Sequence, residues 1–179
     1  NINEQLTLGT TALYSKEEID YDGFNHEFDH IDRTRSAGSI YALFDSGSIT
    51  NKIKRSFSKT DRYDRNGWNK SFIGSRDVWN YTGQTIFNGA NVTFGYEEST
   101  EEADIDGQIK DYKETAVISE VNYALGKNSD ISLAARRTSS KNYGDDTTYR
   151  LAAINRHQDE LTSRLSLIHI SEPTRPVMI

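Results

Sequence analysis

The chain has 179 residues, of which 35% are hydrophobic and 27% are charged, and it contains no cysteine. A net charge of −6 and an isoelectric point near 5.2 argue against a basic nucleic-acid-binding surface, and the lack of cysteine excludes disulfides, thiolate metal sites and a cysteine nucleophile. No run approaches the roughly 20 consecutive apolar residues of a membrane helix, which excludes a helical membrane protein.

Alternation of apolar and polar residues is the dominant pattern, and it predicts strands with two unlike faces. In residues 91–97, for example, Val92, Phe94 and Tyr96 alternate with polar or small residues. The same reasoning along the chain predicts eight strands, near residues 5–16, 34–45, 50–60, 77–87, 90–98, 114–125, 130–138 and 147–156. The fold class expected is therefore all-β and antiparallel.

The connections between these strands alternate between short and long. Residues 45–48, 88–89 and 126–129 are predicted to be tight hairpin turns, and Asn88-Gly89 is the strongest of these turn signals. The polar segments 16–33, 61–76, 99–113 and 138–146 are predicted to be long loops. Strict alternation sends every long loop to the same end of the sheet, which is typical of an outer-membrane β-barrel with short periplasmic turns and long extracellular loops.

A soluble β-sandwich is the competing interpretation, because its strands also alternate. Two observations favour the barrel. The strands are about ten residues long, which suits a tilted crossing of a bilayer. Aromatic residues are also expected to form two girdles, one at strand ends near the long loops (Tyr14, Trp79, Tyr81, Tyr96 and Tyr149) and one near the turns (Phe87 and Tyr123, with Leu125).

A hairpin in the second half of the chain resembles a known family. Residues 113–136, KETAVISEVNYALGKNSDISLAAR, resemble a barrel hairpin of TonB-dependent outer-membrane receptors. Residues 143–153, YGDDTTYRLAA, resemble the loop and returning strand that follow, and residues 90–96 resemble the preceding strand. The order and spacing of elements from Leu6 onward look most like the cobalamin (vitamin B12) transporter branch.

This resemblance implies a barrel of about 22 strands, closed by a plug domain, in the outer membrane of a Gram-negative bacterium. The function implied is uptake of a scarce large nutrient, captured at extracellular loops and moved by energy from the TonB complex, with no enzymatic step. Cobalamin is the ligand expected first, with a ferric siderophore or haem as alternatives. Neither the plug nor its TonB-contacting segment is recognised here, so the chain is expected to be a fragment holding roughly a third of the barrel wall.

The end of the chain resembles something else. Residues 165–175, LSLIHISEPTR, look like the in-frame translation of a sequencing-library adapter, and residues 176–178 have the length of a sample index. The expected organisation is therefore a partial receptor barrel over 1–164 and a non-biological tail over 165–179. A genuine apolar strand is the alternative interpretation of this segment.

Two acidic segments share the pattern Asp-X-Asp-Gly, at residues 20–23 and 104–107. Carboxylates one residue apart on a turn can supply the oxygen ligands that Ca²⁺ requires, and cobalamin receptors of the resembled family use acidic loops that calcium orders. Calcium is the only cofactor considered, and its candidate ligands are Asp20, Asp22, Asp29, Asp32, Asp104 and Asp106. The alternative is an acidic, solvated surface.

The segment 63–72 mixes aromatic and polar residues on the expected exterior side. Such a mixture suits capture of a large amphipathic nutrient, and the candidate ligand-binding residues are Tyr63, Trp68 and Phe72. An ordinary surface loop is the alternative. Glu120, Arg136 and Arg150 are expected to face the barrel interior, where they can pair across strands or contact the plug.

No Ser-His-Asp arrangement or phosphate-binding glycine loop has a convincing context, so no catalytic residue is predicted. Besides the receptor, two other classes stay open: a passive porin or small structural barrel, and a secreted β-sandwich adhesin. The partners expected for a receptor are outer-membrane lipid, the TonB complex and a cobalamin or iron-chelate ligand, without nucleic acid.

Overall fold

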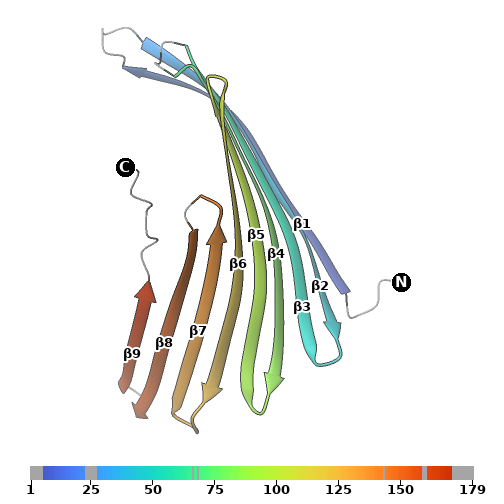
Figure 1. The fold of residues 1–179 in the computed structure, drawn as a ribbon, viewed down its shortest axis with the longest axis vertical. Helices are drawn as coiled ribbons and strands as arrows, with labels where there is room; N and C mark the ends of the chain where they lie inside the picture. The colour runs from blue at the N-terminus through green and yellow to red at the C-terminus, as the bar shows by residue number, and fades with distance from the viewer. Residues whose placement is uncertain are drawn as a thin grey trace.

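The described part of the protein is a single layer of nine antiparallel strands that pair in chain order to form one open, curved sheet (Figure 1). The structure is a computed structural model that describes residues 6–22, 28–65, 67, 69–142, 144–158 and 161–170. The strands are β1 (Leu6–Asp22), β2 (Phe28–Ser46), β3 (Ile49–Asp64), β4 (Ser71–Phe87), β5 (Ala90–Ile105), β6 (Gln108–Ala124), β7 (Ser129–Ser140), β8 (Gly144–Gln158) and β9 (Leu161–Ile170). None of the described residues forms a helix long and apolar enough to cross a membrane.

Each of the eight predicted strands coincides with an observed one, and the three short turns are confirmed. Positive φ angles at Gly47, Asn88, Gly89 and Gly126 are those that tight hairpin turns need. The prediction of long loops is largely wrong. Most residues of the four polar segments continue the strands, so that β1 to β6 reach 16 to 19 residues.

The physical reason for this error is that both faces of the extra strand length are polar. In Glu101–Ile105, for instance, acidic residues occupy both sides of β5, so hydropathy does not alternate although the backbone pairs regularly with β4 and β6. Backbone hydrogen bonds require no apolar side chain. A long polar hairpin can therefore form without the alternation of apolar and polar residues from which strands are predicted.

The ninth strand, β9, was not predicted. It pairs with β8 from Leu161 to Ile170, and the part from Leu165 onward lies in the segment interpreted as an adapter-like tail. An edge strand offers free N–H and C=O groups to any extended segment, so this pairing does not bear on the origin of the tail. The division between residues 164 and 165 stays a prediction.

The register joins the predicted strand faces into two continuous surfaces. Val92 is opposite Val121, and Val121 is opposite Leu133, so the apolar residues of three neighbouring strands lie on one side of the sheet. We call the surface that carries these three residues the apolar face and its opposite, which carries Thr93 and Glu120, the polar face. The predicted partition of faces is thus confirmed.

Apolar residues on the apolar face form a belt that covers only part of each long strand. In β3 the belt runs from Ile49 to Phe57, and in β4 from Trp79 to Phe87. Its length along a strand is about 26 Å, from eight steps of ~3.3 Å. The rest of these strands is mostly polar on both faces and leads to the β1–β2, β3–β4 and β5–β6 hairpins, here named the tips.

The belt crosses the sheet obliquely. We compare the edge of the belt nearer the tips in β8 and in β1. In β8 this edge is Tyr149, and the row of residues paired with Tyr149 across the sheet ends at Leu6 in β1, after Ala135, Ser119, Phe94, Gly83, Asn51 and Phe44. In β1 the edge of the belt nearer the tips is Tyr14, which lies eight residues closer to the tip than Leu6 (from 6 to 14). The edge of the belt therefore moves by about 26 Å along the strands while the sheet advances by seven strand spacings, or about 34 Å. These two lengths give an angle of roughly 40° between the belt and the rows of paired residues.

Most of the predicted aromatic residues lie on the apolar face at the two limits of this belt, with Tyr14, Trp79, Tyr96 and Tyr149 on one side and Phe87 and Tyr123 on the other. Tyr81 lies on the same face but inside the belt, where its hydroxyl donates to Asn51 at 2.8 Å. The upper group sits in mid-strand rather than at strand ends, because the strands continue. One charge lies inside the belt: Arg55 stacks 5.2 Å from the Trp79 ring and bonds Asp77 at 2.8 Å, so its head points toward the polar region.

Side chains on the polar face reach across whole strands. Arg136 on β7 bonds Glu97 on β5 at 3.0 Å, and Arg150 on β8 bonds Glu120 on β6 at 3.3 Å, so these residues pair across strands, which is one of the two roles expected for them. The strand between the partners presents Ala116 or Ala134, whose small side chains leave room for the bridges. Side chains converge on the concave side of a curved sheet, so these contacts indicate that the polar face is concave.

The sheet has almost no core of its own. Among the described residues, Ala116, under the Arg136–Glu97 bridge, is the only buried apolar side chain. The accessible surface is 13,913 Å², whereas a globular protein of 20.3 kDa exposes about 8,800 Å². Within the described residues, nothing covers the apolar belt or the outer edges of β1 and β9. Apolar surfaces and strand edges of this extent are normally covered by another layer of protein, by a partner or by lipid.

Candidate ligand-binding site

The connection between β3 and β4 is held on the polar face by Asp64, which is only 9% exposed. The Tyr21 hydroxyl donates to both carboxylate oxygens at 3.1 Å, and the Gly67 amide donates to Oδ1 at 2.9 Å. The Asp64 amide in turn donates to the Lys70 carbonyl at 2.8 Å. Burial and the bond to Asp64 raise the pKa of Tyr21, so the phenol stays protonated and ties this connection to β1.

The same connection is held on the apolar face by Arg65. Its amide donates to the His30 carbonyl at 3.1 Å, and its guanidinium donates to Asp32 at 3.3 Å. His30 lies between two carboxylates, with Nδ1 at 2.7 Å from Asp20 and Nε2 at 3.4 Å from Asp32. The hydrogen bond with Asp20 raises the pKa of His30, although partial burial opposes this shift.

The tight turn of the β5–β6 hairpin contacts the other end of the connection. Asp106 and Gly107 have φ of 51° and 85°, as a two-residue type I′ turn requires. The Ser71 amide donates to Asp106 Oδ1 at 2.7 Å, and the Asp106 amide donates to the Ser71 carbonyl at 3.1 Å. Three neighbouring hairpin tips are therefore hydrogen-bonded to one another through the β3–β4 connection.

The predicted ligand-binding residues are not brought together. Tyr63 is opposite Ser71 and is 46% exposed on the apolar side of the sheet, whereas Phe72 is opposite Arg62 on the polar side. Adjacent strand positions alternate, so one ligand cannot contact both rings without rearrangement. Trp68 lies outside the described residues.

The predicted calcium ligands are also dispersed. The register puts Asp20, Asp22, Asp32 and Asp104 on the same side as the apolar face and Asp29 on the opposite side, while Asp106 forms the β5–β6 turn. Asp104 accepts a hydrogen bond from the Gly107 amide at 2.8 Å. In the described part of the chain, no three acidic or histidine side chains form a group that could hold a metal ion. The calcium site stays a prediction.

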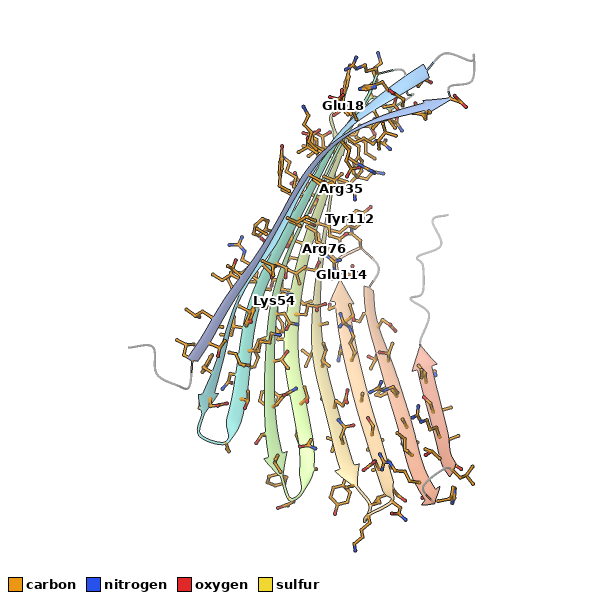
Figure 2. The ribbon with its side chains drawn as sticks, turned by 180° about the vertical axis from the view of Figure 1, so that it is seen from behind. Glu18, Arg35, Lys54, Arg76, Tyr112 and Glu114 are labelled. Carbon is orange, nitrogen blue, oxygen red and sulfur yellow. The ribbon has the colours of Figure 1, made fainter. Side chains whose placement is uncertain are left out.

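A groove on the polar face is the feature that the sequence reasoning missed. Its floor is a row of small residues, Thr60, Gly74 and Ala103, that are paired side by side in β3, β4 and β5. A row with Phe72 forms one wall, and a row with Arg76, Glu101 and Tyr112 forms the other. The volume of the groove is about 290 Å³. Figure 2 shows Arg76 and Tyr112 in the part of the sheet where β1 to β6 extend beyond β7 and β8.

The walls of the groove combine aromatic rings with fixed charges. The Arg62 guanidinium stacks 5.7 Å from the Phe72 ring, and Arg76 bonds Glu101 at 3.1 Å and the Ser99 hydroxyl at 3.3 Å. Gly74 keeps the floor open, because a Cβ there would lie 3.0 Å from the Phe72 ring. An isolated glycine inside a strand signals close approach of this kind, but Gly74 falls in the segment 61–76 that was predicted to be a loop, so this signal could not be read from the sequence.

A second hollow, of about 300 Å³, lies on the apolar face around Ser119, Ala135 and Tyr149. Its lining is mostly apolar, and part of it, Leu167 and His169, belongs to the segment interpreted as an adapter-like tail. The groove near the tips is therefore the better candidate for ligand binding. Comparison of the chain with protein-family models, curated proteins and solved structures finds no match.

Proposed function

We propose that residues 1–164 form part of the wall of a β-barrel receptor in the outer membrane of a Gram-negative bacterium, of the TonB-dependent class that the sequence resembles. The oblique apolar belt is the observation that carries this proposal. Strands of outer-membrane barrels tilt by about 35–45°, and a belt inclined by roughly 40° to the strand rows lies level in the membrane at that tilt.

The dimensions of the belt support the same conclusion. A length of about 26 Å along strands tilted by roughly 40° corresponds to a height of about 20 Å between Cα levels, and side chains extend it toward the ~25 Å band of such barrels. Aromatic residues at both limits, including Trp79 and Tyr123, suit the two lipid–water interfaces. The concave polar face, with its bridges over Ala116 and Ala134, suits a water-filled lumen.

In this proposal the tips, which are the β1–β2, β3–β4 and β5–β6 hairpins, lie on the extracellular side. Ligand binds at the tips and in the groove around Gly74, and TonB-driven rearrangement of a plug carries it inward without covalent chemistry. Cobalamin is the proposed ligand, with a ferric siderophore or haem as the alternative within the class. Further barrel strands attach at the uncovered edge of β1 and at the edge of β8, which the tail segment of β9 occupies in this structure.

Spin-label accessibility tests the membrane topology. The chain has no cysteine, so single cysteines at Val121, Leu133, Asn122 and Ser132 of the full-length protein in lipid vesicles carry one label each. We expect Val121 and Leu133 to be accessible to dissolved oxygen, and Asn122 and Ser132 to a water-soluble nickel complex. A β-sandwich predicts instead that labels at Val121 and Leu133 are immobile and inaccessible to both, and that result refutes the barrel.

A binding measurement tests the ligand separately. Cells displaying the full-length protein are incubated with cobalamin, a ferric siderophore or haem, and saturable uptake is followed with and without dissipation of the proton-motive force. Energy-dependent accumulation of one ligand supports the receptor, whereas equal, non-saturable passage of small solutes favours a porin.

A further inference from the structure

Strand β6 has a backbone edge without a neighbouring strand at its tip end. Every residue of β6 from Gln108 to Tyr123 pairs with β5, whereas pairing with β7 begins only at Glu114. Figure 1 shows β6 continuing beyond the β7–β8 hairpin. Among the described residues, the segment 108–113 therefore has a strand partner on one side only.

The β5–β6 turn fixes which backbone groups of this edge point outward. The turn has two residues, so the flanking pair, Ile105 and Gln108, is hydrogen-bonded. Because bonding alternates along a strand, Ile109 and Asp111 direct their N–H and C=O groups away from β5. Asn142 agrees with this direction, because its side-chain amide donates to the Asp111 carbonyl at 3.3 Å. A side-chain amide thus occupies the position that the backbone amide of an added strand would take.

A notch on the polar face lies beside this edge. It has a volume of about 170 Å³ and is lined by Ser99, Glu101, Tyr112 and Glu114, and Figure 2 shows Tyr112 and Glu114 where β6 passes the end of β7. Arg76 bonds Glu101 at 3.1 Å, but Glu114 has no ion-pair partner among the described residues. The notch therefore carries one uncompensated negative charge.

The opposite side of the same edge presents an apolar side chain. Ile109 is 66% exposed and is opposite Asp104 on β5, so the paired strand offers it a carboxylate rather than an apolar neighbour. A strand added on the outer side of β6 would remove part of this apolar surface from water, which is favourable. The two sides of the edge thus suit different side chains, a basic one at the notch and an apolar one over Ile109.

We propose that the β6 edge binds an extended polypeptide segment of another protein by antiparallel strand addition. The segment bonds the backbone of Ile109 and Asp111, and it displaces the Asn142 side chain from the Asp111 carbonyl. Alternate side chains of the segment reach the two sides of the sheet, so that a Lys or Arg at the end nearest β7 pairs with Glu114 and apolar residues cover Ile109. This inference goes beyond nutrient uptake and rests on the proposed receptor only for access from outside the cell.

The test is fluorescence anisotropy of the peptide acetyl-Lys-Val-Thr-Val-Thr-amide, with a dye at its C-terminus, titrated with the full-length protein in detergent. We expect saturable binding. The same peptide with N-methyl groups on both Val residues cannot donate to β6, and a peptide with Glu in place of Lys repels Glu114. Each change should raise Kd about tenfold or more, and neither alters the fold of the protein.

Variants of the protein test the same contacts. Asp111→Pro removes the outward N–H but leaves the bonds between β6 and β5 in place, so it should raise Kd about tenfold, whereas Asp111→Asn keeps that N–H and is the matched control. Glu114→Gln should raise Kd about threefold or more, and Glu18→Gln in β1, on the opposite side of the sheet, is its control. Asn142→Ala should lower Kd, because it removes the side chain that occupies the Asp111 carbonyl.

The outcomes separate this inference from the receptor proposal. Absence of saturable binding up to about 1 mM protein, or equal binding of the N-methylated peptide, overturns it. Concentration-dependent dimers that Asp111→Pro abolishes, without peptide binding, assign the edge to a second copy of the chain and also overturn it. Spin-label accessibility at Val121 and Asn122 reports the membrane topology independently, so failed peptide binding with barrel-like accessibility refutes the strand-addition site alone.

Discussion

Val121 is the residue whose replacement tests the membrane belt most directly. It lies near mid-height of the belt on β6, is 36% exposed and is flanked by Val92 and Leu133 on neighbouring strands. If the belt faces lipid, Val121→Arg places a cation near the bilayer midplane at a cost of about 2–4 kcal/mol. If the same face is in water, a surface substitution changes the stability by about 0.5 kcal/mol or less.

The neighbouring residue supplies the control. Asn122 lies on the polar face and donates to Glu120 at 2.8 Å, so Asn122→Arg adds a cation beside an existing carboxylate and is expected to change stability by less than about 1 kcal/mol. The measurement is urea unfolding of the full-length protein in lipid vesicles, followed by tryptophan fluorescence. Equal free-energy changes for the two variants would refute the assignment of faces to lipid and lumen.

Three other predictions concern the tips. His30 has a raised pKa from its bond to Asp20, so its stabilisation is complete below the unfolded value of about 6.5 and is lost as pH rises through the higher folded pKa. Protection factors of the β1 and β2 amides near His30, which are exchange rates corrected for the intrinsic effect of pH, should be higher below that pKa than above it, and His30→Gln should remove the difference. Tyr21→Phe deletes the hydroxyl that bonds Asp64 and should cost about 1–2 kcal/mol, measured by urea unfolding, with faster exchange of the Gly67 amide; unchanged exchange would contradict the anchor. Gly107→Ala forces a Cβ into φ of 85° and should destabilise the β5–β6 turn by about 1–2 kcal/mol, which proteolysis of the tip would detect.

The strands were predictable where apolar and polar residues alternate, because successive side chains of a strand point to opposite faces. Val92, Phe94 and Tyr96 face one way because successive strand residues alternate, and this local rule needs no knowledge of neighbours. The tall hairpins were not predictable by the same rule, because their two faces are equally polar. Asp106-Gly107 was nevertheless a readable type I′ turn signal, and it would have replaced the loop predicted for residues 99–113 by a hairpin.

The site was predictable only in part, because it depends on register. Phe72 was singled out for its aromatic ring, and it does form a wall of the groove. Its partners Arg62 and Tyr112 come from two other strands, and no spacing in the sequence aligns them; only the pairing of β3, β4 and β5 with β6 does. The Asp64 anchor likewise joins residues 43 positions apart in the chain.

The strictly sequential order of the strands has a kinetic consequence. Every strand pairs only with its neighbours in the chain, from β1 through β9, so no pairing has to wait for a distant segment. Such a sheet can grow one hairpin at a time from any starting pair, and each addition creates a new template edge for the next strand. A break at any single hairpin would therefore stop elongation at that point and leave the part already assembled intact.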